Sequence, residues 1–123
     1  MIEEIIFRGM GKNGEGWLEG YLFKVWEKAY IIWGTSNGMP NMDEVIPETV
    51  GQYIGLRDAN NKKLFTGDII CTRKFGTPEV RYTIEYDAEI AAFIGTYKKG
   101  CVKHFTTFAG DSDAFELVGS IWD

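Results

Sequence analysis

Lysine and arginine residues interleaved with aromatic residues occur in two short segments, 57–74 and 97–104, and could bind a nucleic-acid strand. The first segment holds five basic and two acidic side chains, and the second holds three lysines and no acid. Small β-barrels bind single strands by pairing a cationic groove with aromatic rings on which bases stack. If the two segments meet in space, phosphate contacts follow and binding weakens steeply with salt. The candidate binding residues are Lys62, Lys63, Arg73, Lys74, Phe75, Tyr97, Lys98, Lys99, Lys103 and His104.

The charge of the whole chain argues against this interpretation. The 123 residues hold 13 basic and 18 acidic side chains, a net charge of −5, so the sequence lacks a uniformly basic footprint. Lysines near hairpin ends are also common as solvated residues that protect sheet edges. Nucleic-acid binding is therefore the alternative function and not the leading one.

Acidic residues form two further groups whose spacing could serve acid–base or metal chemistry. Glu85, Asp87 and Glu89 alternate along the chain, and Asp111 and Asp113 form a second pair. Paired carboxylates can exchange protons or hold a divalent cation. Both groups fall at predicted turns, where acidic side chains are frequent because they are solvated. A metal-assisted hydrolase is therefore a third hypothesis, and it requires Glu85, Asp87, Asp111 and Asp113 to converge.

Three other patterns lack the chemistry that they would need. Residues 9–14 fit G-x-G-x-x-G, but no helix-forming segment follows to bind a pyrophosphate at its N-terminus. Residues 58–63 begin like a calcium loop, yet lysines occupy its fifth and sixth positions. His104 and Cys101 would lie on opposite faces of a strand, which weakens a metal site. We predict no catalytic residue, no metal, no cofactor and no enzymatic activity.

The composition predicts a β protein that must position these side chains. Nineteen Ile and Val residues against five Leu favour strands, because branched side chains pack well on a pleated sheet, and 15 glycines indicate many turns. Short strands separated by turns are typical of a barrel or sandwich. We expect one all-β domain over 1–123, with a loop over 35–41 and a helical turn within 42–49. The predicted strands are 3–7, 17–26, 29–33, 50–54, 64–72 (interrupted at Gly67 and Asp68), 80–86, 90–97, 102–108 and 115–121.

The cysteines and the N-terminal segment bear on the cellular compartment. Cys71 and Cys101 are too few and too far apart for a disulfide framework or a zinc site, and we expect reduced core residues. Residues 1–8 are acidic where a secretory signal is basic, and no apolar stretch is long enough to cross a bilayer. We expect a soluble cytoplasmic protein without membrane contact. Its four tryptophans offer material for an aromatic interface, although most are expected in the core.

The centre of the chain carries a longer motif, with matches at both ends of the sequence. The run VGQYIGLRD over 50–58 is followed by NNKK over 60–63 and by FTGDII over 65–70. This motif resembles the central signature of the YopX family, and residues 4–8 and 116–122 resemble the opening and closing strands of that family. The resemblance implies a small phage or prophage protein in a bacterial host, with a mostly β fold around an SH3-like barrel and no established activity. Asn61 stands where the family usually has a glycine.

The motif residues have structural roles on physical grounds. Gly55 and Gly67 allow positive φ or a close backbone approach, and the Asp68 carboxylate can accept hydrogen bonds from nearby amides. Apolar residues beside them supply the faces of two strands joined by a polar turn. The motif residues to which we assign structural roles are Gly51, Gln52, Tyr53, Gly55, Leu56, Asp58, Asn60, Gly67, Asp68 and Ile69.

The leading functional hypothesis combines this resemblance with the lack of a catalytic constellation in the sequence. We predict a non-enzymatic phage or prophage accessory module that binds a phage or host protein. The alternative is a small β-barrel that binds nucleic acid through segments 57–74 and 97–104. Exposed edge strands would also allow homo-oligomers.

Overall fold

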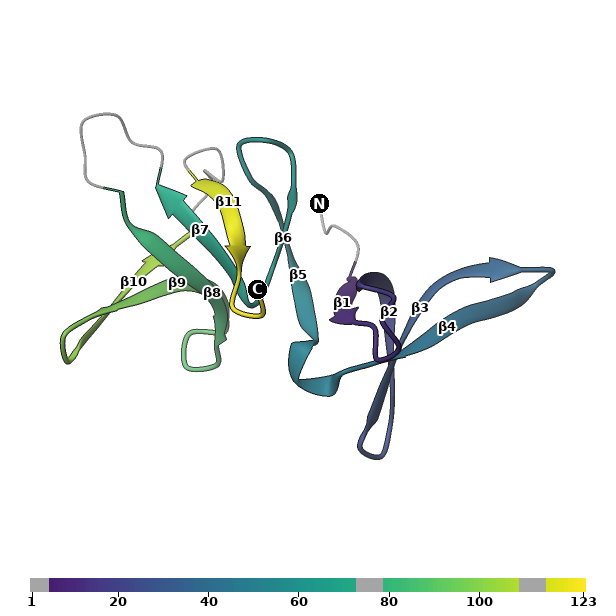
Figure 1. The fold of residues 1–123 in the computed structure, drawn as a ribbon. Coiled ribbons are helices and arrows are strands. Elements are labelled where there is room, and N and C mark those ends of the chain that lie inside the picture. Colours follow the sequence, from purple (N-terminus) through teal and green to yellow (C-terminus); the bar gives the residue numbers. More distant parts are fainter. Residues whose placement is uncertain (1–4, 73–78, 109–114) are drawn as a thin grey trace. The chain divides into compact units, whose positions relative to one another are not determined.

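The computed structural model describes residues 5–72, 79–108 and 115–123 (Figure 1). The chain forms two compact units, Met1–Tyr53 and Ile54–Asp123, which we call unit 1 and unit 2 and describe separately. The strands form two antiparallel sheets, so the predicted all-β class is confirmed. One domain over 1–123 stays a prediction.

Unit 1 is built on a meander of four strands, β1 (Phe7–Met10), β2 (Trp17–Val25), β3 (Lys28–Ser36) and β4 (Met39–Val45). Each strand pairs antiparallel with the next. A 3-10 helix, η1 (Pro47–Thr49), leads into β5 (Gly51–Arg57), whose first residues pair with β1. Because alternate residues of a strand share a face, one face of the meander is apolar and packs into a core. The core of unit 1 comprises Ala29, Ile31 and Val45, with Phe7, Leu18, Leu22 and Val50 packed against them.

The structure corrects two predictions for residues 35–49. Asn37 and Gly38 have φ values of 53° and 79°, and two adjacent positive φ values are typical of a type I′ hairpin turn. The predicted loop over 35–41 is therefore wrong, because β3 continues to Ser36 and β4 begins at Met39. The helical turn predicted within 42–49 is confined to η1, where proline fits the first helical position because it has no amide proton to satisfy.

The first strand lies later in the sequence than predicted. Residues 3 and 4 of the predicted strand over 3–7 lie outside the described residues, and β1 continues through Gly9 to Met10, beyond the predicted end at Phe7. A methyl group built on Gly9 would lie 2.8 Å from Cβ of Val45. Gly9 therefore belongs to the strand because its missing side chain leaves room for the Val45 side chain of the core.

Unit 2 contains the end of β5 and the six strands that follow it. These are β6 (Lys63–Phe65), β7 (Asp68–Thr72), β8 (Arg81–Asp87), β9 (Ala92–Lys99), β10 (Val102–Thr107) and β11 (Phe115–Ser120), close to the predicted ranges. The strands of the second sheet lie in the order β10-β9-β8-β7-β11, while β6 ends the first sheet, β4-β3-β2-β1-β5-β6. The core of unit 2 comprises Leu64, Ile70, Ile84 and Phe115.

Neither sheet closes on itself within the described part of the chain, so the SH3-like barrel stays a prediction. In the same ranges, no helix is long and apolar enough to cross a membrane. The cytoplasmic location also stays a prediction.

Candidate functional site

The described residues of the two basic segments lie in different hairpins of unit 2. Lys62 and Lys63 follow the β5–β6 turn, whereas Lys98, Lys99 and Lys103 surround the β9–β10 turn. Figure 1 shows these two turns well apart within unit 2. Arg73, Lys74 and Phe75, which would extend the first group, lie outside the described residues.

The strand register divides the lysines of the second segment between two faces. Lys98 and Lys103 are directly opposite each other on β9 and β10, so their side chains share a face and their like charges repel. Lys99 follows Lys98 in the same strand and therefore lies on the other face. That face also carries Tyr97 and His104, whose rings stack at a centroid distance of 4.8 Å and an interplanar angle of 13°.

Lys103 forms an ion pair in the structure. Its Nζ lies 2.9 Å from Oε1 of Glu85 on β8. The hydrogen bond to Glu85 and the negative charge of that carboxylate raise the pKa of Lys103 above its ordinary value. This pair offsets the repulsion from Lys98 and leaves less positive charge available to a phosphate.

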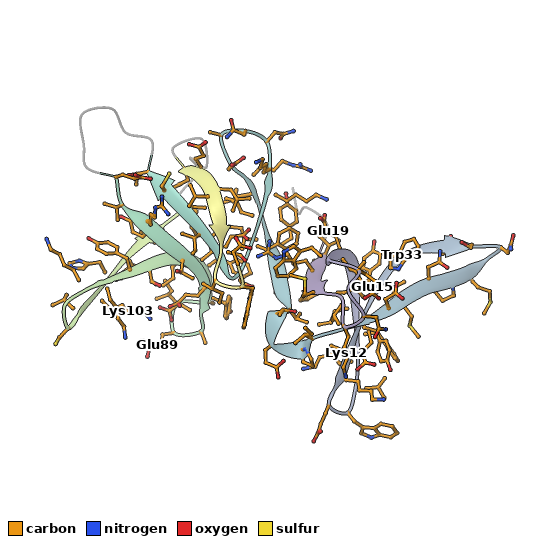
Figure 2. The ribbon with its side chains drawn as sticks, in the orientation of Figure 1. Lys12, Glu15, Glu19, Trp33, Glu89 and Lys103 are labelled. Atoms are coloured by element: carbon orange, nitrogen blue, oxygen red, sulfur yellow. The ribbon has the colours of Figure 1, made fainter. Side chains whose placement is uncertain are left out.

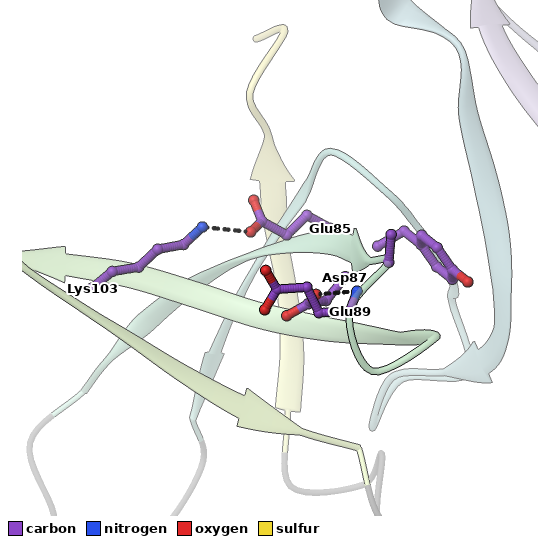
Figure 3. Close-up of a pocket in the computed structure, with 6 residues that line it drawn as sticks. Glu85, Asp87, Glu89 and Lys103 are labelled. Atoms are coloured by element: carbon purple, nitrogen blue, oxygen red, sulfur yellow. Dashed lines mark hydrogen bonds and ion pairs between the residues drawn. The ribbon is translucent and has the colours of Figure 1, made fainter.

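The alternating carboxylates line an open pocket of about 330 Å³ in unit 2 (Figure 3). Its lining includes Glu85, Asp87, Glu89 and Lys103, and the backbone amide of Glu89 donates to Oδ1 of Asp87 at 2.9 Å. No group of three or more acidic, histidine or cysteine residues within 5–72, 79–108 and 115–123 could hold a metal ion. Asp111 and Asp113 lie outside the described residues, so convergence of the four carboxylates stays a hypothesis.

Asp58 holds the β5–β6 turn against β11. Its Oδ1 accepts hydrogen bonds from the backbone amides of Asn60 and Lys62, at 2.9 and 2.8 Å, and its Oδ2 accepts one from the amide of Leu117 at 2.9 Å. Burial alone raises the pKa of this carboxyl, but the three amides and the charge of Lys62 outweigh burial, so the pKa lies below its ordinary value. Asn61 has φ of 63°, a left-handed conformation that asparagine adopts more readily than most other residues.

The second half of the motif forms the bend between β6 and β7. Asp68 is 1% exposed, and its Oδ2 accepts a hydrogen bond from the amide of Phe65 at 2.8 Å. Gly67 has φ of 92°, and its amide donates to the carbonyl of Ile84 at 2.8 Å. Gly55 also has a positive φ, and Tyr53 is buried. These contacts show how Asp58, Gly67 and Asp68 hold the two turns, and the structural roles assigned to the rest of the motif stay predictions.

All four tryptophans have partly or fully exposed side chains, so the expectation that most lie in the core is wrong. Trp17, Trp33 and Trp122 are 37%, 51% and 41% exposed, and Trp26 is 94% exposed. Trp33, labelled in Figure 2, donates from Nε1 to Oδ2 of Asp43 at 2.8 Å. The two unit cores are filled mainly by aliphatic side chains, and the indoles are left at the surface.

The outward face of the unit 1 meander carries one of these tryptophans, Trp17, together with other aromatic and apolar side chains. The register places Tyr21, Ile32 and Met42 in one cross-strand row, and Phe23 opposite Tyr30 in the next. Tyr21, Phe23 and Met42 are 59%, 45% and 46% exposed. The guanidinium of Arg8 lies 4.4 Å from the ring centre of Trp17 at one end. We call this surface the aromatic face, comprising Trp17, Tyr21, Phe23, Tyr30, Ile32 and Met42.

Trp26 continues β2 into the β2–β3 turn, three positions beyond Phe23. Its φ is 54°, a left-handed conformation in which a bulky side chain is crowded by its own backbone. Asparagine or glycine would fit this position with less strain. The sequence predicts a break between two strands at Glu27 and Lys28, but it carries no signal that Trp26 adopts a strained backbone conformation.

Comparison with protein families finds a family that matches most of the chain. The family described as YopX protein matches residues 7–123. No curated protein sequence matches the chain. The match covers nearly the whole length, including the Asp58 and Asp68 turns, and we conclude that the chain belongs to the YopX family.

Proposed function

We propose that the chain is a non-enzymatic phage or prophage accessory module that binds another protein through the aromatic face and Trp26. The single observation that carries this proposal is Trp26, whose indole is 94% exposed on a residue with φ of 54°. Because the indole of Trp26 is exposed, it makes no packing contacts that would offset the backbone strain at this residue. Strain of this kind is frequent where a side chain is held for function.

The aromatic face supports the same interpretation. A sheet that faces water normally alternates apolar residues inside with polar residues outside. Here, however, Tyr21 and Phe23 stand on the outward side of β2 opposite Ile32 and Tyr30. Aromatic side chains and methionine are enriched at protein interfaces, and aromatic rings bury large areas with few rotatable bonds. The face therefore suits a protein partner.

Nucleic-acid binding stays the alternative, carried by the stacked pair Tyr97 and His104 with Lys99 on the same face of β9 and β10. The distribution of charge argues against this alternative. Lys103 is paired with Glu85, and the described basic residues lie in two different hairpins.

The experiment that separates these functions is capture from bacterial host lysate with and without nuclease, beside a titration with single- and double-stranded oligonucleotides at two salt concentrations. A stoichiometric protein partner that survives nuclease supports the proposal. Capture that depends on nucleic acid, together with salt-sensitive oligonucleotide binding, would establish the alternative. Retention of no protein under either condition would contradict the proposal.

A further inference from the structure

Among the described residues, the strand β10 ends the second sheet with its outer side unpaired, and we propose that it pairs antiparallel with β10 of a second copy of the chain, with Phe105 on the two-fold axis. The inference is independent of the aromatic face, because β10 belongs to unit 2. Four strands end the two sheets, β4, β6, β10 and β11.

Three of these edges carry features that oppose further pairing. β4 contains Pro40, and its last residues bond to the chain near Gly11 and Lys12. β6 is only three residues long. The outer edge of β11 is covered by the β5–β6 turn, because the Leu117 amide donates to Asp58 and the Phe115 carbonyl accepts from Ala59. Short, covered or proline-containing edges are how sheets avoid pairing with other chains.

β10 lacks such features within the described residues. It is six residues long and contains no proline, and no other described segment pairs with its outer side. Val102 and Phe105 are 57% and 63% exposed. A lysine on an edge strand usually opposes pairing, but the ammonium of Lys103 is directed to Glu85 on β8, inside its own sheet.

The sequence of β10 selects the register. In an antiparallel pair, opposite residues lie on the same face, so a two-fold axis that continues the sheet passes through a residue and not between two residues. An axis at Lys103 would set two ammonium groups opposite each other, and an axis at His104 would oppose two imidazoles. An axis at Phe105 stacks the most exposed apolar ring of the strand against its own copy. It also sets Lys103 opposite Thr107 and leaves no like charges opposed.

The test is sedimentation of the full chain over a wide range of concentration, together with cysteine cross-linking. We expect a reversible monomer–dimer equilibrium, with the association constant reduced about tenfold or more by Phe105→Lys, because that change sets two charges opposite each other on the axis. Val118→Lys, on the covered edge β11, is the matched control and should leave association unchanged. Circular dichroism confirms that both variants fold.

Cross-linking fixes the register in a Cys101→Ser background, which removes the exposed native thiol. Directly opposed residues of antiparallel strands have Cα atoms about 4.5–5.5 Å apart, within the range of a disulfide. Phe105→Cys should therefore form a covalent dimer on mild oxidation, whereas His104→Cys should not. A chain that sediments as a monomer at its highest soluble concentration would overturn the proposal. So would a dimer that cross-links through position 104, or through neither position.

Discussion

The carboxylate of Asp58 accepts a hydrogen bond of 2.9 Å from the backbone amide of Leu117, a residue 59 positions later in the chain. The same carboxylate closes its own turn by accepting the amides of Asn60 and Lys62. One side chain therefore fixes the β5–β6 turn and attaches it to the closing strand. This gives a physical reason why the central motif and the C-terminal strand of this chain pack together.

Replacement of Asp58 by asparagine should destabilise unit 2. The amide group retains one acceptor oxygen but presents an NH₂ group to a backbone amide that needs an acceptor. Because these are charge-assisted hydrogen bonds in a buried site, we expect a loss of roughly 2–4 kcal/mol in the free energy of unfolding, measured by urea denaturation. Asp87→Asn, which changes a turn at the rim of the pocket, is the control and should cost less than about 1 kcal/mol. Equal losses in the two variants would contradict the role of Asp58.

The depressed pKa of Asp58 predicts a pH dependence of stability. A carboxyl group whose pKa is lower in the folded state than its ordinary value of 3.8 stabilises the fold above that value. This contribution is lost as the pH falls through the folded-state pKa. The difference in unfolding free energy between wild type and Asp58→Asn should therefore be constant from about pH 8 to pH 5 and shrink below about pH 4. A difference that grew on acidification would show that the sign is wrong.

Gly9 should not accept a side chain. A methyl group at this position would lie 2.8 Å from Cβ of Val45, so Gly9→Ala must displace the core of unit 1. We expect a loss of about 1–3 kcal/mol in thermal or urea unfolding. Gly34→Ala is the matched control in the same sheet, since no atom lies within 4 Å of its added methyl group. That variant should change stability by less than about 0.5 kcal/mol.

The contrast between Gly9 and Asn37-Gly38 shows what the sequence could predict. Most strands follow from alternation, as in residues 80–86, where Ile84 is buried as expected. Asn-Gly is a strong hairpin signal, but the polar residues around it favoured a loop, so the β3–β4 hairpin was missed. Gly9 lies beyond the predicted strand over 3–7, because its proximity to Val45 joins residues 36 positions apart and depends on the tertiary structure.

The candidate site was harder to predict for a related reason. Exposure of an aromatic residue depends on which face of a sheet remains uncovered, and a single strand sequence does not specify that. The alternation in β2 separates Leu18 and Leu22 from Tyr21 and Phe23, yet both sets are apolar. Periodicity could not show which set was in the core. The role of Asp68, in contrast, followed from local turn chemistry, whereas the hydrogen bond from Leu117 to Asp58 joins residues far apart in the sequence and depends on the tertiary structure.

Trp26→Asn should stabilise the protein while weakening its function. Asparagine tolerates positive φ better than tryptophan, so relief of strain should add roughly 0.5–1.5 kcal/mol to the free energy of unfolding. Glu27→Asn, the neighbouring position of the same turn, should be close to neutral. Differential scanning calorimetry of the two variants provides the comparison. Destabilisation by Trp26→Asn would show that the indole contributes to folding and would remove the main support for the proposed interface.

The two cysteines should differ in reactivity toward a thiol reagent. Burial raises the pKa of Cys71, and the carboxylate of Glu79 raises it further, so its thiolate is scarce at neutral pH. Cys71 is buried as expected, but Cys101 is exposed at the β9–β10 turn, so the expected core position is wrong for Cys101. Titration with a chromogenic disulfide should give one fast equivalent per native chain and two in urea. Two fast equivalents in the native state would contradict the burial of the Cys71 side chain in β7.

The central claim is that the aromatic face of unit 1 and Trp26 bind a protein, and the most direct measurement quantifies the captured partner for three matched variants. Tyr21→Glu and Trp26→Asn should each reduce nuclease-resistant capture at least about tenfold, because both remove an exposed ring from the proposed interface. Tyr86→Ser removes a comparably exposed ring from unit 2 and should leave capture unchanged. If wild type and all three variants retain the same partner equally, or if only Tyr86→Ser loses it, the claim is contradicted.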